Sequence, residues 1–294
     1  MTTPLKQTQL RPPKAPNLLI APVDYTQTYQ DQMNNALRLY FNEIDNFGFC
    51  LTNNQNGGGG SLLVFPNGAF HQDGTTTLSA NITNNSTTPI SVASTASFPS
   101  GGGYILIGTE IIQYTTATAT TFDGTITRGA LGTTNVAHTA GAQVSEVQAT
   151  GSPTTIGKIL FNNTDASNGV SINPADTSQV VFSVAARYNV QISLQLLSFS
   201  NSPDNVTVWF AQNGVDIPNT ASIATVPAIH GGVPGANIMA FNVYVDVNPN
   251  DYIQVKWTSD SGNSVVATYP AGLSPVHPVS PAIILTAQFV SAVY

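Results

Sequence analysis

Strict alternation between apolar and polar side chains, concentrated within residues 180–294, constrains this fold more than any other feature of the sequence. Residues 190–196 read Val-Gln-Ile-Ser-Leu-Gln-Leu, and residues 241–247 and 253–257 repeat the pattern. Because successive side chains of a strand point to opposite faces of a sheet, each stretch predicts a half-buried antiparallel strand. Further strands are predicted at 180–186, 206–212, 264–269 and 282–292, with one or two more between 215 and 226. About eight short antiparallel strands in one domain favour a jelly-roll sandwich over residues 180–294.

A smaller β-domain is predicted at residues 80–150. Residues 104–114 and 121–129 combine apolar strand sequences with turn signals such as Asp123-Gly124, which is typical of a small β-meander. Residues 51–79 are expected to form a Gly-rich linker and the first strands. Residues 151–179 are rich in Ser, Thr, Asn and Gly, and we expect them to be a connector.

The N-terminal residues 1–23 predict an extended anchoring arm. They contain five prolines, which prevent a continuous helix and favour an extended backbone. Such an arm cannot bury its own backbone, so it stays mobile or lies along a partner. Leu18, Leu19 and Ile20 offer apolar contacts to that partner and are the predicted docking residues.

Residues 24–50 predict a single helix that begins at Asp24 and stops at Gly48. Its apolar residues are separated alternately by four and three positions, which is the spacing of a coiled-coil seam. The predicted seam consists of Met33, Leu37, Tyr40, Ile44 and Phe47. The alternative is an amphipathic helix that packs on its own domain. The four glycines at 57–60 favour association with other copies, because a flexible linker leaves the helix free to associate.

The composition excludes several classes of protein. Only 8% of the residues are charged, against roughly 25% in an ordinary soluble protein. The hydrophobic share of 41% argues against a disordered chain, and 35 Thr and 27 Asn supply neutral hydrogen-bonding side chains in place of charges. A net charge of −7 argues against nucleic-acid binding, which depends on Lys and Arg. No apolar run approaches the roughly 20 residues of a membrane span, and no secretory signal sequence is expected, so no membrane insertion is predicted.

Motifs that carry chemistry are absent from the sequence. It has no P-loop, dinucleotide fingerprint, Gly-x-Ser-x-Gly elbow or His-Glu-x-x-His motif. One cysteine excludes a site with several thiolates, and the four histidines lie far apart. Asp246, Asp251 and Asp260 would either collect a calcium ion or cap turns, and turn capping is favoured. We therefore predict no catalytic, cofactor-binding or metal-binding residue, no cofactor and no enzyme activity.

Residues 180–294 resemble the trimeric jelly roll of complement-type globular heads and tumour-necrosis-factor-like domains, in the version found at the C-terminus of many tailed-phage virion proteins. The stretches that carry this resemblance follow the family's order and are 188–194, 206–214, 250–257 and 283–294. The chain departs from the family at Ala186, where Gly is usual, and at Val190, where Phe is usual. The unit at 104–144 is similar to a β-module of phage tail and appendage proteins, and the helix behind its proline-rich arm is similar to N-terminal regions of phage structural proteins.

Together these resemblances imply a non-enzymatic structural protein of a tailed-phage virion, assembled in the host cytoplasm. It would be a homotrimeric fibre or appendage protein, docked by its N-terminus on capsid or tail proteins, with its β-domains projecting. The helix would then form a short trimeric coiled coil. Two alternatives stay open: a capsid decoration (cement) protein, and an adhesin that binds a host surface glycan through loops such as 230–235 or 270–278.

Overall fold

The computed structural model describes residues 27–52, 65–273 and 275–292. The chain divides into two compact units, Met1–Phe65 and Pro66–Tyr294. The first contains the helix α1 (Gln27–Thr52), and the second contains all of the described strands. In the described part of the chain, no helix has both the length and the apolar character needed to cross a membrane.

The helix α1 continues through Gly48, so the predicted stop at this residue is wrong. Glycine inside a helix costs only about 1 kcal/mol relative to alanine, which a helix of 26 residues tolerates. Asp24, the predicted start, lies outside the described residues. The docking residues predicted in the arm, Leu18, Leu19 and Ile20, lie outside them as well.

The larger sheet of the second unit is centred on β14 (Ala186–Ser198), and all its pairings are antiparallel. On one side β14 pairs with β18 (Gly235–Val247), and on the other it pairs with β23 (Ile283–Ser291) and β20 (Ser264–Ala267). Next to β23 lie β1 (Asn67–Gln72) and β11 (Asn163–Asn168). Next to β20 the sheet continues through β9 (Gln143–Ala149), which also pairs with β2 (Thr75–Thr77), and then through β4 (Gly103–Ile107), β5 (Glu110–Tyr114) and β8 (Thr127–Ala130).

A second antiparallel sheet packs against the first to complete a sandwich. Its order is β12 (Val170–Ile172), β13 (Val180–Phe182), β19 (Tyr252–Ser259), β15 (Asp204–Gln212) and β16 (Val215–Asp216). Two further strands pair with it, β10 (Gly157–Lys158) with β19 and β17 (Ser222–Val226) with β15. The smaller sheets contain β3 (Ile90–Ser91), β7 (Thr121–Asp123) and β6 (Thr116–Ala117), and β21 (Gly272–Leu273) with β22 (Val276–His277).

The core of the sandwich confirms the alternation read from the sequence. Every second side chain of β14 points inward, and these residues are at most 1% exposed: Tyr188, Val190, Ile192, Leu194 and Leu196. They meet the inward residues of the second sheet, among them Phe210 of β15 and Trp257 of β19. Trp257 is 1% exposed, so it belongs to the core. The predicted mainly β class, with an antiparallel sandwich of jelly-roll type, is thereby confirmed.

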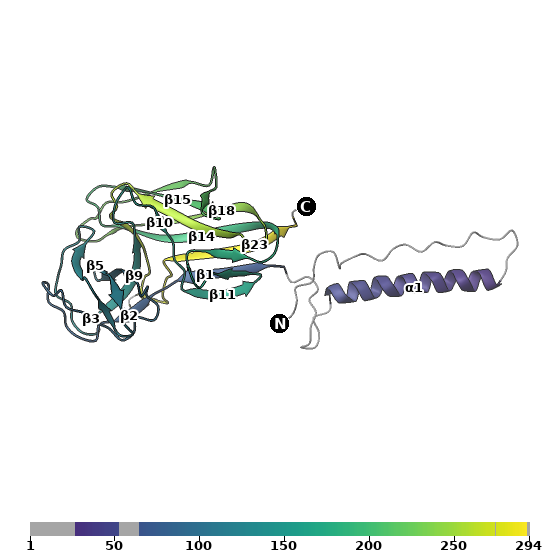
Figure 1. Cartoon of the computed structure of the whole chain (residues 1–294), viewed down its shortest axis with the longest axis horizontal. Coiled ribbons are helices and arrows are strands. Elements are labelled where there is room, and N and C mark those ends of the chain that lie inside the picture. The colour runs from purple at the N-terminus through teal and green to yellow at the C-terminus, as the bar shows by residue number, and fades with distance from the viewer. Residues whose placement is uncertain (1–26, 53–64, 274, 293–294) are drawn as a thin grey trace. The chain divides into compact units, whose positions relative to one another are not determined.

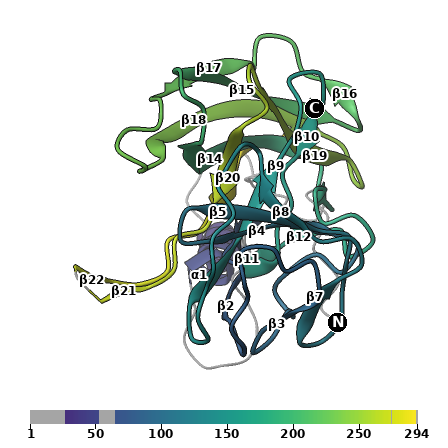
Figure 2. The same ribbon diagram turned by 90° about the vertical axis from the view of Figure 1, so that its left-hand side faces the viewer.

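The small β-domain has its own core, built around Phe122 and Tyr114, whose ring centroids lie 4.6 Å apart. A third cluster, which includes Val147 and Val265, joins this domain to the sandwich along β9 and β20. Figure 2 shows the strands β3 and β7 of the small domain at one end of the second unit, with β15 and β17 at the opposite end. Figure 1 shows β14, β23, β1 and β11 side by side. The two domains therefore share one continuous sheet.

Residues 151–179, expected as a connector, contribute β10, β11 and β12. Ile159 and Phe161 from this segment are buried in the sandwich core. The strand β11 consists of small residues, all polar except Ala166, so its sequence carries no apolar period that would predict a strand.

Candidate functional site

The outward side of β18, β14 and β23 is the candidate functional site. Residues that pair directly across these strands point to the same side of the sheet and form rows. We define the outer face by its uncharged residues, which are Ile238, Ala240, Asn242 and Tyr244 on β18, Asn189, Gln191, Ser193 and Gln195 on β14, and Ile284, Thr286, Gln288 and Val290 on β23.

Large apolar side chains are exposed on this outer face. Tyr244 is 64% exposed and Ile238 62%, while Ile284 and Val290 are 43% and 47% exposed. Between them lie short amides and hydroxyls, and Asn242 donates a hydrogen bond of 2.8 Å to the Oδ1 of Asn189. A contiguous surface of apolar and neutral side chains is suited to contact with another protein surface.

Charge on the three strands is confined to one end of the outer face. There Arg187 donates two hydrogen bonds to Asp246, from Nε at 2.7 Å and from Nη2 at 2.8 Å. The hydrogen bond from Arg187, together with its positive charge, holds the pKa of Asp246 below its ordinary value. Because the two charges neutralise each other, a partner surface would meet little net charge here.

The strand β18 is also an edge strand. Within the described residues it pairs with β14 alone, so the other side of its thirteen-residue backbone is not used in a sheet. Proteins protect long exposed edges with charges, prolines or bulges, because unpaired edges invite aggregation. Asp246 is the one charged residue of β18, and it lies near the end of the strand. This edge is consistent with a strand that another chain covers.

Sequence reasoning did not identify the outer face. Its signal was present in the alternation itself: Tyr244, Ile238 and Ile284 occupy the phase of their strands that should be polar. Several apolar residues in the solvent-facing phase of neighbouring strands indicate a second contact surface. In the sequence prediction, the alternation indicates only the core side of each strand.

The predicted trimer seam lies on α1. Met33, Leu37 and Tyr40 are half-buried, and Ile44 is 37% exposed, whereas the side chain of Phe47 lies outside the described residues. Leu39 and Phe41, which are not part of the seam, are more than half exposed. The helix therefore carries apolar side chains beyond the predicted stripe, and the coiled coil stays a prediction.

The described part of the structure contains two buried glutamates, Glu110 and Glu146, whose pKa values are shifted in opposite directions. Glu110 forms an ion pair with Arg128. Its Oε1 accepts a hydrogen bond from Nε of Arg128 at 2.7 Å, and its Oε2 accepts one from Nη2 of Arg128 at 2.8 Å. Nε2 of His138 lies 2.8 Å from Oε2 of Glu110. The backbone N–H groups of Gly129 and Val136 also donate hydrogen bonds to the carboxylate. Burial alone would raise the pKa of Glu110, but these hydrogen bonds outweigh it and the pKa lies below its ordinary value. This network ties the loop after β8 to β5.

Glu146 of β9 is the unpaired buried glutamate. It is 3% exposed, and Gln72 donates a hydrogen bond to its Oε2. Burial raises the pKa of Glu146 to about 8 despite this hydrogen bond, and the negative charge of Asp73 raises it further. The carboxyl group is therefore mostly protonated at neutral pH, and it lines two hollows of the second unit.

The other candidates from the sequence have structural partners. Among the described residues, no group of three or more His, Cys, Asp or Glu side chains could hold a metal ion. Asp251 accepts hydrogen bonds from the N–H of Asn248 at 2.7 Å and from the side chains of Asn213 and Gln212, which braces two adjacent turns. Asp260 accepts one from Asn205. Asp251 therefore caps a turn as predicted, whereas Asp260 bonds to a residue of β15 and Asp246 pairs with Arg187.

Comparison of the chain with models of known protein families and with curated proteins found no match.

Proposed function

We propose that this chain is a structural protein of a tailed-phage virion, a homotrimeric fibre or appendage protein that docks through its N-terminal residues and projects its β-domains. It has no catalytic role in this proposal. Support comes from the resemblance of residues 180–294 to trimeric jelly rolls and from the mainly β fold. The virion is its site of action after assembly in the host cytoplasm.

The observation that carries the proposal is the outer face. A buried trimer contact should be apolar or neutral at its centre and depleted in charge. The outer face has these properties, with Tyr244, Ile238 and Ile284 exposed and the Arg187–Asp246 pair at one end. The edge of β18 that pairs with no described strand adjoins the same residues. Contact with further copies of the chain would bury both.

The experiment that tests this contact places charge on the outer face. The double variant Ile238→Lys, Tyr244→Lys should shift the full-length protein from trimer to monomer in sedimentation velocity, because unpaired buried charges oppose association. The matched control is Val276→Lys, which adds a charge at an 85% exposed position of the β21–β22 hairpin. A double variant that sediments like the control would refute the outer face as the trimer contact.

A decoration protein of the capsid is the second role that this architecture serves. Particles assembled without the chain would then disassemble at a lower temperature than complete particles, whereas loss of a fibre would leave the capsid's disassembly temperature unchanged. The comparison of the two particle types separates these roles.

A further inference from the structure

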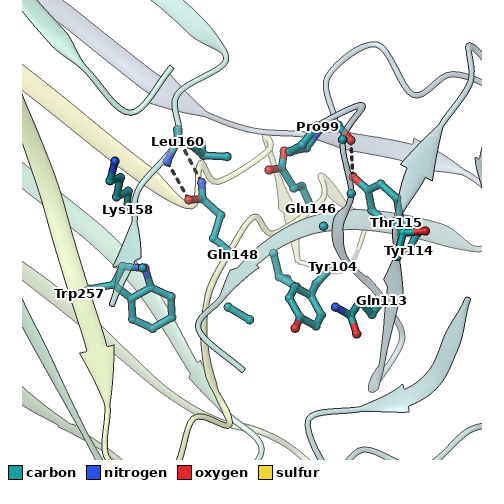
Figure 3. Close-up of a pocket in the computed structure, with 16 residues that line it drawn as sticks. Pro99, Tyr104, Gln113, Tyr114, Thr115, Glu146, Gln148, Lys158, Leu160 and Trp257 are labelled. Carbon is teal, nitrogen blue, oxygen red and sulfur yellow. Dashed lines mark hydrogen bonds between the residues drawn. The ribbon is translucent and has the colours of Figure 1, made fainter. Parts of the chain in front are cut away.

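A cavity of about 380 Å³ lies where the small β-domain meets the sandwich. Figure 3 shows its walls: Tyr104 and Gln113 on one side, Lys158 and Trp257 on the other, with Glu146 and Gln148 between them. The volume falls within the roughly 300–1,000 Å³ of small-molecule sites. All these residues belong to the same compact unit.

The wall from the small domain presents a partly exposed aromatic ring beside a side-chain amide. Tyr104 of β4 pairs directly with Gln113 of β5, so the two side chains lie next to each other on one side of the sheet. Both are half-buried, and Figure 3 shows no hydrogen bond from either side chain to another lining residue. A ring with a hydroxyl and an amide offers one stacking surface and several hydrogen-bonding atoms.

The floor of the cavity contains a buried carboxyl group. Glu146 uses Oε2 to accept the hydrogen bond from Gln72, while Oε1 has no hydrogen bond to any residue drawn in Figure 3. Because burial raises its pKa to about 8, the group carries a proton at neutral pH and can donate as well as accept. Gln148 beside it is already occupied, since it exchanges two hydrogen bonds with the backbone of Leu160.

The lining selects the charge of a ligand. Among the described lining residues, Lys158 is the one basic side chain, and it is exposed at the rim, where its positive charge acts on Asp176. A single rim lysine is a poor anion site, and a protonated Glu146 does not attract a cation. The polar and apolar groups of the lining are mixed, which disfavours a purely apolar ligand. A neutral ligand with hydroxyl groups and one apolar face remains.

We propose that this cavity binds a neutral saccharide, with the ring of Tyr104 stacking on the sugar face and with Gln113 and Glu146 hydrogen-bonding its hydroxyl groups. The site differs from the loops suggested by the sequence, and it does not depend on the outer face or on the oligomeric state. It therefore goes beyond the proposed structural role.

The test is saturation-transfer NMR on the full-length protein with the methyl glycosides of glucose, galactose, mannose and N-acetylglucosamine as probes. We expect transfer to at least one of them. Gly101→Tyr should reduce it: Gly101 lines the cavity, and a Cβ there meets no atom within 4 Å, so the fold has room for a bulky side chain at this position.

Gln113→Ala should weaken binding of the same glycoside roughly tenfold, the effect of one lost hydrogen bond. The matched control is Gln143→Ala, an exposed amide at the start of β9 that does not line the cavity, and it should bind like the unmodified protein. Absence of transfer to all four glycosides, or equal transfer with Gly101→Tyr, would overturn the saccharide site. Neither result bears on the trimer contact, which is tested by sedimentation.

Discussion

Replacing Glu146 by Gln should stabilise the protein at neutral pH, although the residue is buried and hydrogen-bonded. Gln keeps an oxygen that accepts the hydrogen bond from Gln72, and it has the same size. It removes the ionisation that burial and the nearby Asp73 oppose. The substitution therefore removes the free-energy cost of ionising a buried carboxyl group and leaves the packing around β9 intact.

The size of the effect follows from the pKa of Glu146, which rises from an ordinary 4.5 to about 8 in the folded protein. A raised pKa means that the folded state holds the proton more tightly, so this contribution to stability is complete below pH 4.5 and is lost as the pH rises to about 8. The whole contribution of this proton to the free energy of unfolding is about 5 kcal/mol, of which about 3 kcal/mol is lost by pH 7. Glu146→Gln should recover about this amount at pH 7.

Urea unfolding at about pH 5, pH 7 and pH 8 measures the effect, because a stability change shifts the midpoint without altering the slope. The unmodified protein should lose stability across this range relative to Glu146→Gln, and the gap should widen with pH. Equal pH dependence of the two proteins, or destabilisation by Glu146→Gln at pH 7, would refute the reasoning.

Glu110 provides the matched comparison, since the same substitution there should have the opposite sign. Glu110→Gln leaves the buried guanidinium of Arg128 without its charged partner and should cost about 3–5 kcal/mol. The pKa of Glu110 lies below its ordinary value, so its contribution is present above pH 4.5 and is lost as the pH falls. The two glutamates thus separate a paired from an unpaired buried carboxyl group within one domain.

Three further predictions concern packing and attachment. Gly235→Ala should lower the urea midpoint strongly, because a Cβ there would lie 1.8 Å from the carbonyl oxygen of Pro227, whereas Gly101→Ala meets open space and should leave the midpoint unchanged. Leu194→Ala should reduce the free energy of unfolding by about 2–5 kcal/mol in urea titrations, since Leu194 is fully buried in the sandwich core. Removal of residues 1–50 should abolish attachment to the particle in a co-sedimentation assay but leave the β-domains folded by circular dichroism; continued attachment would contradict the anchoring role.

The sandwich could be predicted from the sequence because its strands bury one side only. In β14, in β19 and in residues 241–247 of β18, apolar residues recur at every second position, and the structure places these in or against the core as expected. The helix could be found by its apolar spacing, but its end could not, because Gly48 disfavours a helix too weakly to stop it. Local pattern therefore predicted elements better than their ends.

The parts that could not be predicted depend on contacts between distant residues. The strand β11 pairs with β1 across more than ninety positions of the chain, and its Asn-Thr-Asp-Ala-Ser-Asn sequence has no apolar phase. The cavity at the domain junction likewise brings Tyr104 near Trp257, from strands of different sheets. The pKa of Glu110 lies below its ordinary value and that of Glu146 lies above it because their three-dimensional surroundings differ, which the residue type alone does not reveal.

The most direct test of the central proposal is the mass of the unmodified full-length protein in solution, measured by sedimentation equilibrium at micromolar concentration. Association of three copies through the outer face predicts a mass three times that of one chain. A single-chain mass under these conditions would contradict the trimer, and with it the proposed role as a trimeric virion protein.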